Sequence, residues 1–380
     1  PSAAWFNGFA IHCLEWDALH EPSVVIALCT TTAALISETE CSDVSLQHIL
    51  EALIIGVETA VFFGAAATTE PRFFRPSAAG LMGAAMALGW IRAYSRPQML
   101  DLLGLAYSQV AGTMQAHWEG SEALPLQIGL AARSALTAAD LVENGMTGPH
   151  DVIDGKFGYF KLIEQAKDLD AQFDRWARPW KITEVAHKPF PAGRATQATL
   201  TAIMDIGKET RLDMDEIASI TVSLPSLIML LVGRPYMHDM SPAYARLCLE
   251  FIAPMMIREG RIDPRLFTRE IMNSDRAAAD AKKIAIVLDD NPDPNALAPQ
   301  HIEILFADGR TEERNIGFPF GSPKFPMSRD DQLNKIGFCF EVAGFAATPA
   351  ALLASIFDSV ESTQMRDVID IVTGSRKAAI

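Results

Sequence analysis

Long apolar segments without strand-like alternation occupy the first half of the chain and predict helices. They cover residues 24–36, 46–63, 77–93, 98–116 and 129–144, and a shorter helix is expected near 159–167. The middle segments are rich in Ala, Leu, Met and Gly, and small residues at this density let helices pack closely together. We therefore expect a buried helical bundle in this half of the chain.

The pattern changes after residue 178, where short alternating segments predict strands. Strands are expected at 181–187, 217–224, 283–288 and 301–306, and helices at 196–210 and 243–258. Residues 307–310, with the sequence ADGR, are typical of a hairpin turn. From residue 345 onward the pattern is helical again, with Thr348 and Pro349 as its start signal.

This order of elements predicts a mainly α fold with an inserted α+β domain. Residues 1–179 and 345–380 would form a helical-bundle domain, and residues 180–344 would form a smaller α+β lid. A cleft between two domains is a common place for a small-molecule site. We therefore expect the functional site to lie between the bundle and the lid.

Composition narrows the range of partners. The 380 residues are 49% hydrophobic and 21% charged, which is typical of a globular protein with a sizeable core. A net charge of -15 disfavours nucleic acid and anionic membranes as partners. No segment reaches the ~18 uninterrupted apolar residues of a membrane span. The chain starts at Pro1 without an initiator Met, so we expect it to be a piece of a longer protein.

The cysteines indicate the compartment. There are five of them, none forms a C-x-x-C pair, and their number is odd. This pattern is typical of free thiols in a reducing compartment rather than of a disulfide framework or a zinc site. A cytoplasmic location is therefore expected.

The segment NGFAIHCLEWDALHEPS near the N-terminus concentrates proton-carrying groups. It places His12, Glu15, Asp17, His20 and Glu21 within ten residues. On a helix, His12 and Glu15 would share one face, and Asp17 and Glu21 another. A carboxylate beside a histidine suits general acid–base catalysis because each group tunes the pKa of the other. The alternative is a set of surface charges around a core histidine. No H-E-x-x-H or comparable spacing occurs, so no metal is expected here.

Two further segments bring cations to turns. In KPFPAGRATQA, Lys188 and Arg194 bracket a rigid turn that precedes a helix start, where free backbone N–H groups favour an anion. Because a lysine at the edge of a turn is rarely structural, Lys188→Ala is expected to leave the fold intact. In FFRPSAAG, Arg75 precedes a proline at a helix start and suits a bidentate pair with a carboxylate. The alternative in both segments is ordinary exposed cations.

Taken in order, these segments resemble the MmgE/PrpD family. The N-terminal block is similar to the family's N-G-x-x-x-H-x-L-D-F-D-D segment, FFRPSAAGLMGAAMALG to its F-H-P-T helix start, and KPFPAGRATQATLTAI to its K-P-Y-P-x-C-R segment. The family includes 2-methylcitrate dehydratases, cis-aconitate decarboxylases and iminodisuccinate epimerases. The resemblance implies a helical domain with an α+β lid, a homodimer, and catalysis with no metal or organic cofactor.

The chain departs from the family pattern at several histidines. Glu15 stands where the family has its first Asp, Glu21 where it has the histidine of H-P-S, Arg75 where it has that of F-H-P, and Gln197 where it has the one after K-P-Y-P. Lys188 and Arg194 are retained, and His20 is adjacent to the altered H-P-S position.

The resemblance implies a site in which Glu15, Asp17, His20 and Lys188 are catalytic. Arg75, Arg194 and Gln197 would bind the carboxylates of a small di- or tricarboxylate. The shared step would be proton abstraction next to a carboxylate, with nearby cations stabilising the charge that develops. The leading expectation is a lyase that dehydrates a hydroxy-polycarboxylate, as 2-methylcitrate dehydratase does. The alternatives are an epimerase or isomerase, a decarboxylase, and a catalytically inactive polycarboxylate-binding protein.

Overall fold

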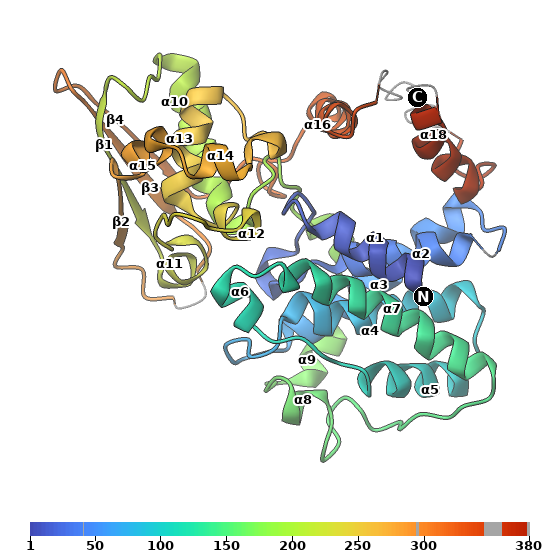
Figure 1. Ribbon diagram of the computed structural model, residues 1–380. Coiled ribbons are helices and arrows are strands. Elements are labelled where there is room, and N and C mark those ends of the chain that lie inside the picture. The colour runs from blue at the N-terminus through green and yellow to red at the C-terminus, as the bar shows by residue number, and fades with distance from the viewer. Residues whose placement is uncertain (41, 294–295, 346–358, 378–380) are drawn as a thin grey trace.

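A computed structural model describes residues 1–40, 42–293, 296–345 and 359–377, and it is mainly α with a smaller α+β part (Figure 1). This fold class agrees with the prediction from the sequence. The bundle lies in the lower part of Figure 1 and the sheet with its helices lies at the upper left. The expected helix start at Thr348 and Pro349 lies outside the described residues.

The bundle is built from helices whose small residues allow close contact. Its helices are α1 (Ser2–His12), α2 (Ala27–Thr39), α3 (Leu46–Ala65), α4 (Arg75–Ile91), α5 (Arg96–Tyr107), α6 (Gln115–Glu119) and α7 (Ala123–Glu143). In α4, a Cβ on Gly83 would lie 2.3 Å from the backbone oxygen of Gly56 in α3, and one on Gly80 would lie 2.7 Å from Oγ1 of Thr30 in α2. Glycine at these positions therefore lets α4 run through the middle of the bundle.

Helix α3 is also long and apolar enough to cross a membrane by length and composition alone. In the protein, 61% of that apolar stretch is buried. A core helix gives the same composition, since it is apolar on most sides.

The α+β part contains a four-stranded mixed sheet of order β2-β1-β3-β4. Its strands are β1 (Ile217–Leu224), β2 (Ile284–Leu288), β3 (Gln300–Phe306) and β4 (Thr311–Ile316). The pair β1–β2 is parallel and the other two pairs are antiparallel, so the β3–β4 hairpin expected at residues 307–310 is confirmed. Ile220, Val222 and Leu224 of β1 are fully buried beneath the helices that cover the sheet, as period-2 alternation requires.

The helices of this part include α10 (Gln197–Glu209), α11 (Ser226–Val232), α12 (Pro242–Ala245), α13 (Leu249–Glu259), α14 (Arg269–Met272) and α15 (Asp275–Ala281). The expected strand at 181–187 is wrong. The segment forms a 3-10 turn, η2 (Lys181–Glu184), followed by a single bridge between Ala186 and Leu19. With only one backbone bridge to pair with, its alternation reflects partial burial rather than a sheet.

The chain returns to the bundle after the sheet. Helix α16 (Arg329–Val342) leads away from the α+β part, and α18 (Met365–Lys377) lies near α2 (Figure 1). Between the two parts, buried residues of the bundle such as Phe74 and Ile128 belong to the same hydrophobic cluster as Leu200 and Leu247 of the α+β part. This shared core fixes the two parts against each other around the site.

Candidate active site

The side chain of Lys188 joins two acidic residues that lie far from it in the sequence. Its Nζ is 2.9 Å from Oδ1 of Asp17, 3.0 Å from Oε2 of Glu15 and 3.1 Å from the backbone oxygen of Glu15. Lys188 is only 1% exposed. Burial alone lowers its pKa, but the two carboxylates raise it above the usual value, so the ammonium keeps its charge.

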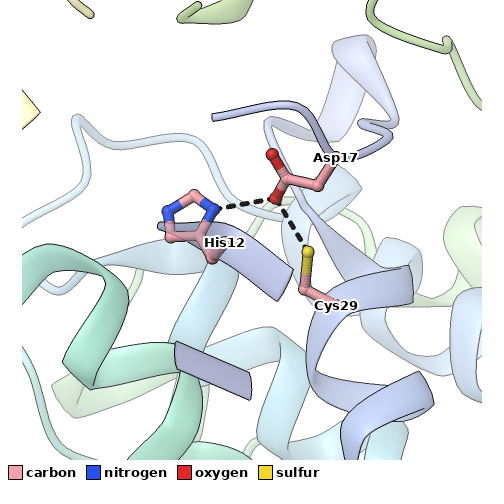
Figure 2. A group of neighbouring side chains, drawn as sticks. All are labelled: His12, Asp17 and Cys29. Carbon is pink, nitrogen blue, oxygen red and sulfur yellow. Dashed lines mark hydrogen bonds and ion pairs between the residues drawn. The ribbon is translucent and has the colours of Figure 1, made fainter. Parts of the chain in front are cut away.

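His12, the last residue of α1, faces the same carboxylates from the other side. Its Nδ1 lies 2.8 Å from Oδ2 of Asp17 (Figure 2). Its Nε2 lies 3.4 Å from Oε1 of Glu15 but is not aligned for a hydrogen bond. Burial lowers the pKa of His12, yet Asp17 and Glu15 outweigh that effect and raise it above 6.5. The imidazolium is thereby favoured, and two cations and two anions form a neutral buried group.

A tight turn after α1 makes this group possible. Helix α1 ends at His12, and Glu15 adopts a left-handed φ of 54°. A non-glycine residue pays a conformational cost there. The acidic block therefore does not continue as a helix, and the pairing considered for a helix does not describe it. Instead, the turn returns Glu15 and Asp17 toward His12, so that all three meet Lys188.

Trp16 holds this acidic turn in place from three sides. Its Nε1 donates to the oxygen of Pro189 at 3.1 Å, and its own backbone oxygen accepts from Nζ of Lys335 at 2.8 Å. Its ring meets that of Phe338 edge-on at 5.3 Å. Trp16 stands between Glu15 and Asp17 in the sequence, so α16 and the Lys188 segment together fix the position of both carboxylates. Burial lowers the pKa of Lys335 to about 8.

A cavity of ≈ 120 Å³ lies beside this group. Apolar side chains from both parts of the protein form most of its wall, and its polar lining residues are His12, Glu15, Arg75, His117, Lys188 and Arg194. Arg194 belongs to η3 (Arg194–Thr196), and its Nε donates to Oε1 of Glu21 at 2.7 Å. Its Nη1 and Nη2 are buried and have no partner within the described ranges. These two nitrogens are suited to an anion that enters the cavity.

Other residues that the sequence singled out make mainly protein contacts. Arg75 lines the cavity, but its guanidinium binds Oε1 of Glu164 at 2.8 Å, so its charge is already neutralised. The amide of Gln197 binds backbone groups of Phe190 and Ala192.

His20 likewise does not face the cavity. Its ring nitrogens contact Oγ of Ser23 at 2.8 Å and Oε2 of Glu184 at 3.2 Å. Burial lowers its pKa more than Glu184 raises it. Neither Gln197 nor His20 is among the residues that line the cavity.

The fold also brings to the site a neutral histidine and two arginines that no motif marked. His117 lines the cavity, and burial together with the charge of Arg234 lowers its pKa to about 4. Arg234 and Arg246 of the α+β part lie within electrostatic reach of Glu15. No local spacing relates these residues to Lys188. Only the packing of the lid against the bundle does, so the sequence alone offered no signal for them.

One trio among the described residues carries donor atoms suited to a metal, namely His12, Asp17 and Cys29 (Figure 2). The thiol of Cys29 donates to Oδ2 of Asp17 at 2.7 Å, and burial first of all keeps its pKa well above the usual value. The second oxygen of Asp17 binds Lys188. A metal would have to remove the thiol proton of Cys29 and compete with the ammonium of Lys188 for Asp17. The carboxylate of Asp17 is therefore better suited to pairing with Lys188 than to binding a metal.

This architecture agrees with the family comparison. Residues 1–172 match the MmgE/PrpD N-terminal domain and residues 190–344 match the MmgE/PrpD C-terminal domain. The chain therefore belongs to the MmgE/PrpD family.

Two curated relatives are enzymes. Cis-aconitate decarboxylase of Homo sapiens is 28% identical over 381 residues, covering 95% of this chain and 74% of the relative. The same enzyme of Mus musculus is 27% identical over 352 residues, covering 88% of this chain and 70% of the relative. These relatives support an MmgE/PrpD-type enzyme.

Proposed function

We propose that this protein is a cofactor-independent lyase that acts on a small tricarboxylate or dicarboxylate. The observation that carries the proposal is a pair of buried Arg194 nitrogens with no partner in the described part of the chain, in the cavity that Lys188, Glu15 and His12 also line. A carboxylate that enters the cavity would gain two charge-assisted hydrogen bonds from Arg194.

Substrate binding would also activate the base. In the free protein, burial raises the pKa of Glu15, but Lys188 and His12 together outweigh this effect and bring the pKa below its usual value. Glu15 is therefore a weak base. A substrate carboxylate that takes one of the three N–H groups of Lys188 weakens its hold on Glu15. The basicity of Glu15 then rises only when substrate is present, and Glu15 removes the proton next to the carboxylate.

His12 supplies the acid that dehydration requires. The imidazolium is favoured by its raised pKa, and Nε2 has no hydrogen-bond partner among the residues that the structure describes. It can therefore donate its proton to a departing hydroxyl while Glu15 holds the proton from carbon. A C–H bond and a C–O bond break, a double bond forms, and water leaves. An acid and a base on adjacent sides of one cavity make dehydration the leading reaction.

Decarboxylation is the second candidate, and the curated relatives favour it. It needs no base, because loss of CO₂ leaves the electron pair on carbon. Lys188 would stabilise that charge, and His12 would protonate the product carbon. Epimerisation and carboxylate binding without turnover are further outcomes that the same cavity allows.

One experiment separates these reactions. The purified chain is incubated in D₂O with citrate, 2-methylcitrate and cis-aconitate, and the products are followed by NMR and ultraviolet absorbance. Dehydration gives a new conjugated double bond from a hydroxy acid, whereas decarboxylation releases CO₂ from cis-aconitate. Deuterium uptake without a double bond indicates epimerisation. The Glu15→Gln variant is expected to lose dehydration and deuterium exchange. If the protein neither binds nor turns over any of these acids, the proposal is contradicted.

A further inference from the structure

Two arginines of the α+β part are stacked on aromatic rings beside the site. The guanidinium of Arg234 lies 4.8 Å from the centre of the Tyr244 ring, and that of Arg246 lies 4.7 Å from the centre of the Phe267 ring. Stacking covers one face of a guanidinium and leaves its N–H edge free. Each arginine is thus held rigidly with its hydrogen-bonding edge available.

Some of these N–H groups lack acceptors among the described residues. Arg246 is 8% exposed, its guanidinium makes no hydrogen bond or ion pair with any residue in the described ranges, and its Nε is fully buried. Arg234 Nη1 is also buried without an acceptor in the described part of the chain, while its Nη2 donates to the backbone oxygens of His117 and Leu231. Buried donors without acceptors destabilise a protein unless a ligand supplies the acceptor.

Neither arginine is among the residues that line the cavity, but both make hydrogen bonds to residues that do. The amide of Gly193, which lines the cavity, donates to the oxygen of Arg246 at 3.1 Å. Leu247, the next residue, lines the cavity as well. Both acceptors of Arg234 Nη2, His117 and Leu231, also belong to the lining.

A backbone bridge connects the segments that carry the two arginines. Gly233 pairs with Cys248, and the Cys248 thiol donates to the oxygen of Arg234 at 3.4 Å. Arg234 and Arg246 are therefore held by two bridged segments on the lid side of the cavity.

We propose that Arg234 and Arg246 form a second carboxylate subsite on the lid side of the cavity. This inference rests on the proposed function and deepens it. Arg194 and Lys188 hold the carboxylate next to the reacting carbon, and the stacked pair receives another carboxylate of the same substrate. Burial lowers the pKa of both arginines, and Glu15, the carboxylate within their electrostatic reach, already has Lys188 and His12 as partners. A second substrate carboxylate would accept hydrogen bonds from both guanidiniums, so the site selects polycarboxylates over monocarboxylates.

Calorimetry with two unreactive acids tests this subsite. Tricarballylate has three carboxylates, and pentanoate has the same five-carbon chain with only one. Wild type is expected to bind tricarballylate about 10- to 100-fold more tightly than pentanoate, since one charge-assisted contact to a carboxylate contributes a factor of that size. Arg246→Met is expected to abolish most of this preference by weakening tricarballylate binding alone.

The matched control is Arg310→Met. Arg310 is also stacked on a ring, at 4.6 Å from the centre of Phe306, but it is exposed and paired with Asp308 at 2.7 Å. The Arg310→Met variant should bind both acids with wild-type affinity. Thermal unfolding adds a readout that a purely structural arginine would not give. Without ligand, Arg246→Met should melt at the wild-type temperature or higher, because it removes an unpaired buried cation, and its melting temperature should rise less with tricarballylate.

Three outcomes would overturn the subsite. The preference for tricarballylate could persist in Arg246→Met, both acids could weaken equally, or ligand-free Arg246→Met could melt far below wild type. If Arg194→Met abolishes binding while Arg246→Met does not, the subsite fails and the proposed function stands. If wild type binds neither acid, both proposals fail.

Discussion

Nζ of Lys188 lies 2.9 Å from Oδ1 of Asp17, a residue 171 positions earlier in the chain, and both side chains are buried. The lysine is therefore structural as well as a candidate for catalysis. The expectation that Lys188→Ala leaves the fold intact is not supported by this placement, because the change would leave two buried carboxylates with His12 as the one cation between them. Removing one partner of a buried pair typically costs about 3–5 kcal/mol.

Lys188→Ala is accordingly expected to lower the free energy of unfolding by about 3–5 kcal/mol, as measured by urea titration at pH 7. Lys208→Ala is the control, since Lys208 lies on the surface with Asp205 as its partner, and it should leave the midpoint unchanged. The double variant Lys188→Met with Asp17→Asn should recover much of the loss, because it removes charge on both sides. Wild-type stability in Lys188→Ala would contradict the buried pair.

Arg194→Lys keeps the positive charge but loses the planar pair of Nη groups. We expect it to weaken citrate binding about 10-fold or more, because a bidentate contact is replaced by a single point charge. Titration calorimetry measures the change. Arg211→Lys, on an exposed arginine next to Asp213, serves as the control. Equal citrate affinity in all three proteins would show that Arg194 does not hold the ligand.

The pH dependence of stability tests the state of His12. Its pKa is raised in the folded protein, so His12 contributes most stability below about pH 6.5, the ordinary histidine pKa. That contribution is lost as the pH rises through the raised value. The difference in unfolding free energy between wild type and His12→Gln should therefore shrink between pH 6 and pH 9. His238→Gln, on an exposed histidine, should show no such trend. A difference that grows with pH would mean that the buried histidine is neutral.

Lys335 is expected to act through Trp16 as a positioning residue. Lys335→Met removes the hydrogen bond to the backbone oxygen of Trp16 and should lower kcat about 10-fold with little change in KM, because misplaced acid–base groups slow the chemical step. Lys335→Gln retains an N–H donor and should recover part of the rate. Gln332→Met, one turn earlier on α16 and exposed, is the control. A rise in KM without a change in kcat would place Lys335 in substrate binding instead.

The hydrophobic periodicity of the sequence correctly predicted those helices and strands that are determined by their own residues. The helices near 46–63 and 77–93 and the strand at 217–224 were found because their periodicity matches their burial. The expected helix at 98–116 is instead two helices, with a break at which Gly112 adopts a φ of 89° and its oxygen accepts from Phe74. This break depends on a tertiary contact, which the spacing of residues within the segment cannot predict.

The candidate site shows the same division. Motifs marked Lys188 and the acidic block, but a helix drawn through that block separates Glu15 from Asp17, whereas the turn at Glu15 unites them. Arg246 and Lys335 enter through packing between distant segments, which no spacing encodes. The homodimer and the cytoplasmic location remain predictions.

A crystal structure with bound citrate tests the central claim most directly. A citrate carboxylate is predicted within hydrogen-bonding distance of Nη1 and Nη2 of Arg194, with a second oxygen near Nζ of Lys188 and the adjacent carbon facing Glu15. Citrate found only on the surface, or an occupied cavity in which Arg194 and Lys188 keep their present contacts and touch no ligand, would contradict the account.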